Sequence, residues 1–320
     1  MKKSFFILCI ILYCLNSCNE ASAFWIWTPK SKKLVNPKYA SKDTPEQQFE
    51  WAMHFFDKKE YKRAAEEFTR LVAHFKDSDL APEAQYYAGR SYEEANKFYP
   101  AFDAYQKTIE VYPFTKRIDE IIERQYNLGN TLYRKYGGIF MGKEIMTDLE
   151  RAIEIFRTVR KNAPFGEYAD QAQFMIAQCY KKSEQYDEAK EAFQELIDEY
   201  PHSILADKAE YEAAQCTYLA SLNPDYDQEL TEDAIKEFKK IAKSKENSHA
   251  SKEAEDALFL LEDKKAQSLF NIAKFYEKQK HYRSARIYYE EVLEEYSWSS
   301  FAKLARERLK DIAKLTEQEE

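Results

Sequence analysis

Small and aromatic residues recur along the chain with a fixed spacing, and this recurrence predicts pairs of helices. In "EWAMHFFDKKEYKRAAEEFTRLV" (residues 50–72), a small residue is followed by an aromatic three positions later and then by a turn that carries another aromatic. An alanine follows that second aromatic by three positions, and a further aromatic comes four positions after the alanine. The same order recurs in residues 87–113, 176–201 and 272–296. Apolar residues three and four positions apart line one helix face, so each segment predicts two amphipathic helices joined by a short turn.

The small residues mark the places where the two predicted helices of a unit approach each other most closely. The first helices carry Ala52, Gly89, Ala177 and Ala273, and the second helices carry Ala64, Ala101, Ala189 and Ala285 twelve positions later. Large aromatics at the turn fill the space between the helices: Tyr61, Phe98, Tyr186 and Tyr282. Pro113, Pro164 and Pro201 should end second helices, because proline cannot continue a helix. This spacing, in a unit of about 34 residues, is typical of tetratricopeptide repeats.

Two further units carry insertions. Gly129 and Ala152 bracket a unit with eleven extra residues, and Ala214 and Ala234 bracket one with eight. A sixth unit has a long first helix at about 250–280. A last helix at 300–315 should cover it, since a repeat buries its apolar face only against a neighbour. We therefore predict an all-α fold, a right-handed tetratricopeptide (TPR) α-solenoid of about six helix–turn–helix units plus a C-terminal cap helix.

The first residues have the order of an export signal. Lys2 and Lys3 precede an apolar run at 5–15, which is shorter than the about 20 residues of a membrane-spanning helix. Two cleavage sites follow this run. The sequence "LNSC" (15–18) matches a bacterial lipobox, which would leave a lipid-bearing Cys18 as the first residue. The sequence "ASA" (21–23) matches an ordinary signal-peptidase site, which would release a soluble protein.

The short distance between the apolar run and Cys18 favours the lipobox. Asn19 follows in place of the aspartate that retains lipoproteins in the inner membrane, so the outer membrane of a Gram-negative-type bacterium is the expected destination. The predicted organisation has four parts: a lipoprotein signal peptide at 1–17, a lipidated and largely irregular tether at 18–44, an N-terminal TPR extension at 45–147 and a C-terminal TPR region at 148–320. Palmitate is an expected acyl group on the anchor.

Composition narrows the choice of partners. The formal net charge of −8 becomes about −10 once Lys2 and Lys3 leave with the signal, which argues against nucleic acid because phosphate binding needs a basic stripe. Only 6 glycines and 9 prolines with 32% charged residues indicate long helices with solvated faces. Beyond Cys18, the mature chain keeps only Cys179 and Cys216, each within an apolar helical pattern. We expect both as small buried hydrophobes and not as a disulfide.

No motif predicts catalysis, a cofactor or a metal. Residues 137–143 match most of a phosphate-binding loop, but Glu144 stands where that loop needs serine or threonine, and a helix precedes in place of a strand. A glycine-rich connection between helices is the better interpretation of this segment. The five histidines lack the close spacing of metal ligands, and no nucleophile elbow occurs.

An aromatic residue stands three positions before the small residue of every first helix. These residues are Phe49, Tyr86, Tyr126, Phe174, Tyr211 and Phe270, named here the aromatic stripe. In TPR arrays this position tends to face the groove in which extended peptides lie, but packing between neighbouring units accounts for the stripe equally well. Gln178 and Lys181, with Gln171 and Lys182 nearby, would suit an apolar peptide that ends in a free carboxylate.

Residues 151–315 resemble the BamD family, the TPR lipoproteins of the outer-membrane β-barrel assembly machine. The family's P-F-G-x-Y turn is matched by Pro164, Phe165, Gly166 and Tyr168, and the interrupted unit at 210–250 is also similar. The chain departs from the family in its extra N-terminal repeats at 45–147 and in Ser297, where a proline is expected.

The resemblance implies a lipid-anchored periplasmic scaffold, not an enzyme, that helps insert β-barrel proteins into the outer membrane. It implies that the C-terminal repeats bind the barrel-forming subunit of the machine and that other assembly lipoproteins are partners. Unfolded outer-membrane proteins would meet the repeats around residues 165–200. The alternative is a periplasmic TPR scaffold of the cell-envelope or Tol–Pal type without a role in barrel assembly.

Overall fold

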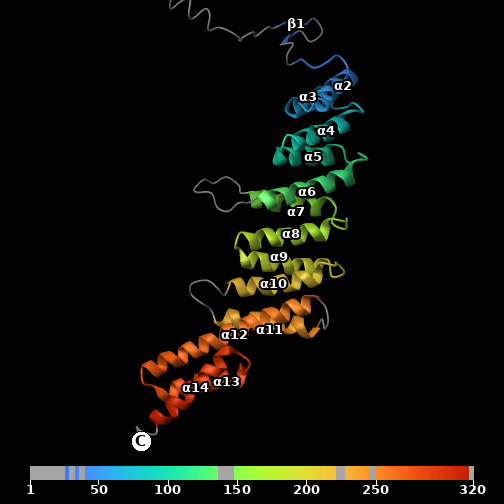
Figure 1. Cartoon of the computed structure of the whole chain (residues 1–320). Helices are drawn as coiled ribbons and strands as arrows, with labels where there is room; N and C mark the ends of the chain where they lie inside the picture. Colours follow the sequence, from blue (N-terminus) through green and yellow to red (C-terminus); the bar gives the residue numbers. More distant parts are fainter. Residues whose placement is uncertain are drawn as a thin grey trace, which may run out of the picture. The chain divides into compact units, whose positions relative to one another are not determined.

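The computed structural model describes residues 26–28, 33–35, 40–135, 148–220, 228–244 and 249–316, and these residues are helical apart from turns and one short hairpin (Figure 1). The hairpin pairs β1 (Ile26–Thr28) with β2 (Lys33–Val35) in antiparallel register. This hairpin lies within the segment for which a largely irregular tether was predicted. The segment contains β-branched residues at Ile26, Thr28 and Val35, a composition that favours strands.

The chain divides into two compact units, Met1–Ile118 and Asp119–Glu320. The helices of the first are α2 (Pro45–Asp57), α3 (Tyr61–His74), α4 (Ala81–Glu94) and α5 (Phe98–Val111). Each of them packs against the next along the chain. This arrangement is two helix–turn–helix pairs in succession, as the spacing of small and aromatic residues predicted.

The second unit has the same arrangement of successive helices, and its α12 is the longest described helix. Its helices are α6 (Ile118–Lys135), α7 (Asp148–Asn162), α8 (Ala169–Lys182), α9 (Tyr186–Glu199), α10 (Ala206–Ala220), α11 (Gln228–Ser244), α12 (His249–Lys278), α13 (Tyr282–Glu295) and α14 (Ser300–Thr316). The predicted long helix and cap helix are present as α12 and α14. Because α12 has 30 residues, it contacts α10 and α11 as well as α13 and α14. The described fold is the all-α TPR solenoid that the sequence predicted.

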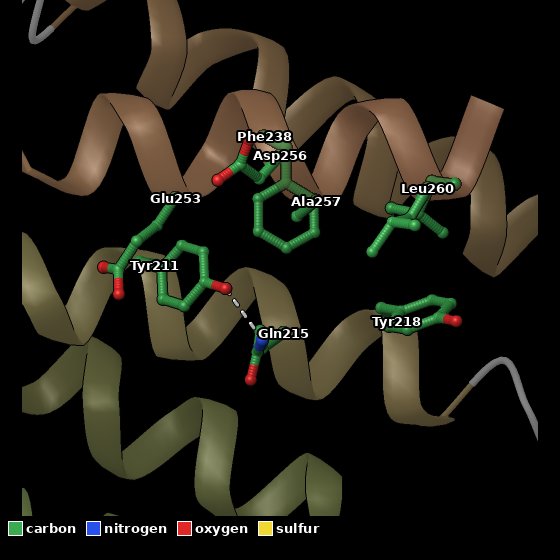
Figure 2. Close-up of a pocket in the computed structure, with 9 residues that line it drawn as sticks. Tyr211, Gln215, Tyr218, Phe238, Glu253, Asp256, Ala257 and Leu260 are labelled. Carbon is green, nitrogen blue, oxygen red and sulfur yellow. Dashed lines mark hydrogen bonds between the residues drawn. The ribbon is translucent and has the colours of Figure 1, made fainter. Parts of the chain in front are cut away.

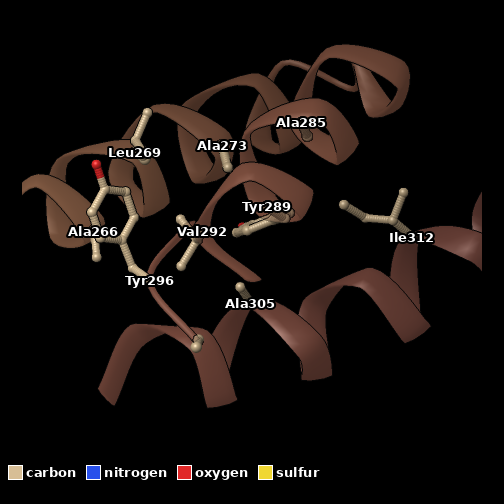
Figure 3. Close-up of a cluster of buried hydrophobic side chains, with 10 residues drawn as sticks. Ala266, Leu269, Ala273, Ala285, Tyr289, Val292, Tyr296, Ala305 and Ile312 are labelled. Carbon is tan, nitrogen blue, oxygen red and sulfur yellow. The ribbon is translucent and has the colours of Figure 1, made fainter. Parts of the chain in front are cut away.

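The predicted small positions lie in the helix contacts and are almost completely buried. Ala64, Ala101, Ala152, Ala189, Ala234 and Ala285 of the second helices have no exposed surface. Figure 3 shows this contact in the last unit, where Ala273 and Ala285 lie beside the buried ring of Tyr289. Two units have glycine in the first helix for a steric reason. A Cβ atom at Gly89 would lie 2.6 Å from the Tyr105 ring, and one at Gly129 would lie 2.7 Å from the Phe156 ring.

The turns within units are also as predicted. Second helices begin at the turn aromatics Tyr61, Phe98, Tyr186 and Tyr282. Two residues before each of them the backbone is left-handed, at Lys59, Asn96, Glu184 and Lys280, with φ between 57° and 63°. Helices α5, α7 and α9 end before Pro113, Pro164 and Pro201, as expected.

Several sequence predictions concern residues outside the described ranges. They include Cys18, both cleavage sites and the glycine-rich segment at 137–143. Among the residues that are described, no helix combines the length and apolar character needed to cross a bilayer.

Candidate protein-binding site

Every residue of the aromatic stripe packs on an aromatic ring of the second helix of its own unit. The ring pairs are Phe49–Phe68, Tyr86–Tyr105, Tyr126–Phe156, Phe174–Phe193, Tyr211–Phe238 and Phe270–Tyr289, with centroids 5.3–6.0 Å apart. All six second-helix rings are fully buried. The stripe therefore forms part of the contact between the two helices of each unit.

Five stripe rings are also covered by a side chain that lies further along the chain. The covering residues are Tyr87 over Phe49, Arg117 over Tyr86, Tyr168 over Tyr126, Lys208 over Phe174 and Phe301 over Phe270, at 4.7–5.9 Å. As a result, only 1% of Tyr86 and 8% of Phe174 is exposed. These two rings have little surface left for a ligand.

Tyr211 differs from the other stripe residues because it borders an open pocket of about 220 Å³ (Figure 2). The pocket lies where α10, α11 and α12 meet. Its lining residues are Tyr211, Gln215, Tyr218, Phe238, Glu253, Asp256, Ala257, Leu260 and Leu261. Of these residues only Glu253 and Asp256 are charged, and both are acids.

The pocket has an apolar base and an acidic side. Phe238 and Leu261 are buried at its base. The side-chain amide of Gln215 donates a hydrogen bond of 2.8 Å to the Tyr211 hydroxyl, which fixes that ring. Burial, together with the negative charge of Glu253, raises the pKa of Tyr211, so its phenol stays neutral at physiological pH. A neutral, hydrogen-bonded and partly apolar wall of this kind suits an apolar side chain of a ligand.

The polar groove residues predicted on α8, Gln178 and Lys181, do not form a carboxylate site at this pocket. Lys181 of α8 places its ammonium 2.5 Å from the Glu212 carboxylate and 2.6 Å from the Gln215 side-chain oxygen. Its charge is thus neutralised within the protein. Gln178 is half-buried on α8 and does not line the pocket. The acidic groups at Glu253 and Asp256 would repel a peptide carboxylate at this place.

A set of buried glutamines stands directly before the stripe, and the spacing of small and aromatic residues did not predict their role. Gln48, Gln85 and Gln173 each donate from the side-chain amide to a backbone carbonyl of the second helix, at 2.8–3.1 Å. The accepting carbonyl belongs to the residue before the buried second-helix ring in all three cases. The signal was present, because glutamine precedes the stripe residue in four units.

The remaining described side chains that could react or bind a metal are buried or do not cluster. Cys179 and Cys216 are free and buried, as predicted, and burial raises the pKa of each thiol to about 12. In the described ranges no three histidine, cysteine or acidic side chains converge as a metal site would require.

The comparisons with known proteins bear on the segment that contains the pocket. Residues 143–316, more than half of the chain, match the model of the YfiO family, described as outer membrane lipoprotein. The chain belongs to the YfiO family. This match agrees with the resemblance noted at 151–315, and it includes α7 to α14. Within the extra N-terminal repeats of this YfiO-family chain, residues 83–115 match a tetratricopeptide repeat model.

Solved structures, two of them of proteins described as TPR proteins, are similar to this chain at low identity. MamA from Desulfovibrio magneticus RS-1 is 16% identical over 64% of this chain and 96% of that chain, with a TM-score of 0.31. A TPR repeat-containing protein from Cytophaga hutchinsonii is 14% identical over 78% of this chain and 83% of that chain, with a TM-score of 0.35. A thermophilic TPR protein from Thermus thermophilus is 14% identical over 67% of this chain and 99% of that chain, with a TM-score of 0.32. No curated protein matches the chain.

Proposed function

We propose that this YfiO-family chain is a lipid-anchored periplasmic scaffold that helps insert β-barrel proteins into the outer membrane. The observation that carries the proposal is the family match over 143–316, which coincides with a stack of TPR helices. Such helices present long surfaces to other proteins. The proposal includes Cys18 as the lipid-bearing residue, because two or more acyl chains give the stable anchoring that a scaffold at the membrane needs.

The distribution of exposed apolar side chains supports a partner at the C-terminal repeats. Ten large apolar side chains are exposed in the described part of the chain, and six of them belong to α12, α13, α14 and their turns. These six are Phe259, Leu260, Phe275, Ile287, Trp298 and Leu304. Large apolar groups on a surface mark contacts with other proteins when they gather in one region. We propose that this region contacts the barrel-forming subunit of the assembly machine.

The scaffold acts by holding partners, and we assign it no catalytic residue. The helix contacts are filled by rings and small residues, so the backbone keeps a fixed spacing between successive helices. Binding groups on different repeats are therefore held at fixed separations within each compact unit. An unfolded outer-membrane protein held by one set of repeats would be kept close to the subunit held by another, which raises its effective concentration.

Affinity purification from detergent extracts tests the proposal. The full-length tagged protein should co-purify a β-barrel protein, and mass spectrometry should show acyl chains on Cys18. A Cys18→Ala variant should lose the acyl mass and fractionate with soluble proteins. Co-purification of Tol–Pal-type envelope proteins without any barrel protein would contradict the proposal and favour the alternative scaffold.

A further inference from the structure

Tyr211 is the one residue of the six in the stripe whose ring borders open space and has no covering side chain among the described residues. At the other five positions a tyrosine, phenylalanine, lysine or arginine lies against the stripe ring. Helix α12 presents the small side chain of Ala257 to the pocket and places Leu260 at its edge, 68% exposed. An external side chain could take the place that a covering residue takes elsewhere.

The size of the pocket suits one large apolar side chain. An apolar cavity of about 150 Å³ holds a benzene ring. The volume here is about 220 Å³, and the lining includes Phe238, Leu261 and Leu260. A phenylalanine or leucine side chain fits such a space, whereas a drug-sized ligand needs about 300 Å³ or more.

Charged groups are distributed unevenly around the pocket. Glu253 and Asp256 stand at the Tyr211 end of the pocket, as Figure 2 shows. At the Tyr218 end, the Lys264 ammonium lies 5.6 Å from the centre of the Tyr218 ring. The acidic end therefore favours a cation on the ligand, and the lysine fixes which end of the pocket that cation approaches.

We propose that this pocket binds a partner polypeptide through an apolar side chain that has a lysine or arginine beside it in sequence. The apolar side chain covers Tyr211 and Phe238, and the cation lies against Glu253 and Asp256. This inference rests on the proposed function only in that the protein is a scaffold for other proteins. It names the chemistry that one of its sites recognises.

Fluorescence anisotropy with a defined peptide tests the inference. The probe is a fluorescein-labelled heptapeptide, blocked at both ends, with one phenylalanine between two lysines. The protein is the mature full chain in detergent micelles. The probe should bind, and it should bind more weakly when serine replaces the phenylalanine or glutamates replace the lysines. Raising the salt concentration from about 0.05 M to about 0.3 M should also weaken binding, because the charges are near the surface.

Matched variants locate the binding. Leu260→Asn should weaken binding of the lysine probe about tenfold, because it places a polar amide at the edge of the apolar space without adding a charge. Asp256→Lys should weaken binding of the lysine probe and strengthen binding of the glutamate probe. The control Val111→Asn changes a side chain of similar exposure on α5, 61% against 68%, and should leave affinity unchanged. Equal affinity in Leu260→Asn and Val111→Asn, in proteins with the same melting temperature, would overturn the inference.

The result for the pocket can be distinguished from the result for the proposed function. Probe binding that depends on Leu260 and Asp256, with no barrel protein in the purification, would uphold the pocket and contradict the assembly role. A co-purified barrel protein, together with a probe that does not bind, would uphold the assembly role and contradict the pocket.

Discussion

Gly89 is the residue where packing most clearly overrides local preference. Alanine is about 1 kcal/mol better than glycine inside a helix, yet a Cβ at Gly89 would lie 2.6 Å from the fully buried Tyr105 ring. Gly89→Ala should therefore lower the free energy of unfolding by about 1–3 kcal/mol, the usual cost of overpacking a core. Urea unfolding followed by circular dichroism measures this change.

A second substitution separates the steric cause from other effects of Gly89→Ala. In a Tyr105→Leu background the ring is gone, so the same glycine-to-alanine change should be neutral or stabilising. If Gly89→Ala stabilised the otherwise unchanged protein, the close approach of helix and ring would be contradicted.

The two cysteines give a pH prediction at the residue scale. Only a thiolate reacts with a disulfide reagent, and burial raises the pKa of Cys179 and Cys216 to about 12. Below that pH the native thiols stay protonated, so both should react slowly at pH 9 and quickly once urea unfolds the protein. Absorbance of the released thiol from Ellman's reagent follows the reaction. Fast reaction at pH 9 without urea would show that these helices open readily.

At the scale of elements, four helix pairs of the described chain are joined by a turn with one residue in the left-handed region. Glu184 has φ of 63°, a left-handed conformation that costs a residue other than glycine or asparagine about 1–2 kcal/mol. Glu184→Gly should relieve this strain, and after the greater flexibility of unfolded glycine is subtracted it should stabilise by up to about 1 kcal/mol. Thermal unfolding of the variant measures the gain.

A comparison within the chain sharpens that test. Asn96 has the same conformation with φ of 57°, but asparagine tolerates it, so Asn96→Gly should change stability less than Glu184→Gly does. Glycine lowers the free energy of unfolding when it replaces another residue at an exposed helix position. An equal loss in Glu184→Gly would contradict the explanation that the Glu184 backbone is strained.

The helices could be predicted from the sequence because their determinants are local. The stripe ring and its buried partner are 19 residues apart in four units, and the two longer separations follow from the insertions of eleven and eight residues. The pocket could not be predicted in this way. Its existence depends on which side chain covers each stripe ring. The covering residue varies in type from unit to unit and lies between 31 and 42 residues after the stripe residue. The pairing of Lys181 with Glu212 also depends on packing between units.

At the scale of the molecule, the two compact units carry different functional features. The family match at 143–316 falls within Asp119–Glu320, and that unit holds the pocket and most of the exposed apolar side chains. Met1–Ile118 carries the larger part of the extra repeats at 45–147 and the proposed anchor. We infer that partner binding in barrel assembly belongs to the second unit, while the first unit connects it to the lipid.

The most direct test of the assembly role is site-specific photocrosslinking in cells. A photoreactive phenylalanine analogue replaces Leu304 of α14 or Ile287 of α13, and the control position is Val111 of α5, which is exposed to nearly the same extent as Ile287, 61% against 62%. Mass spectrometry then identifies the crosslinked proteins. The account predicts a β-barrel protein attached at Leu304 or Ile287 and absent at Val111. Crosslinks at Leu304 and Ile287 to envelope proteins of the Tol–Pal type alone, or a barrel protein captured only at Val111, would contradict it.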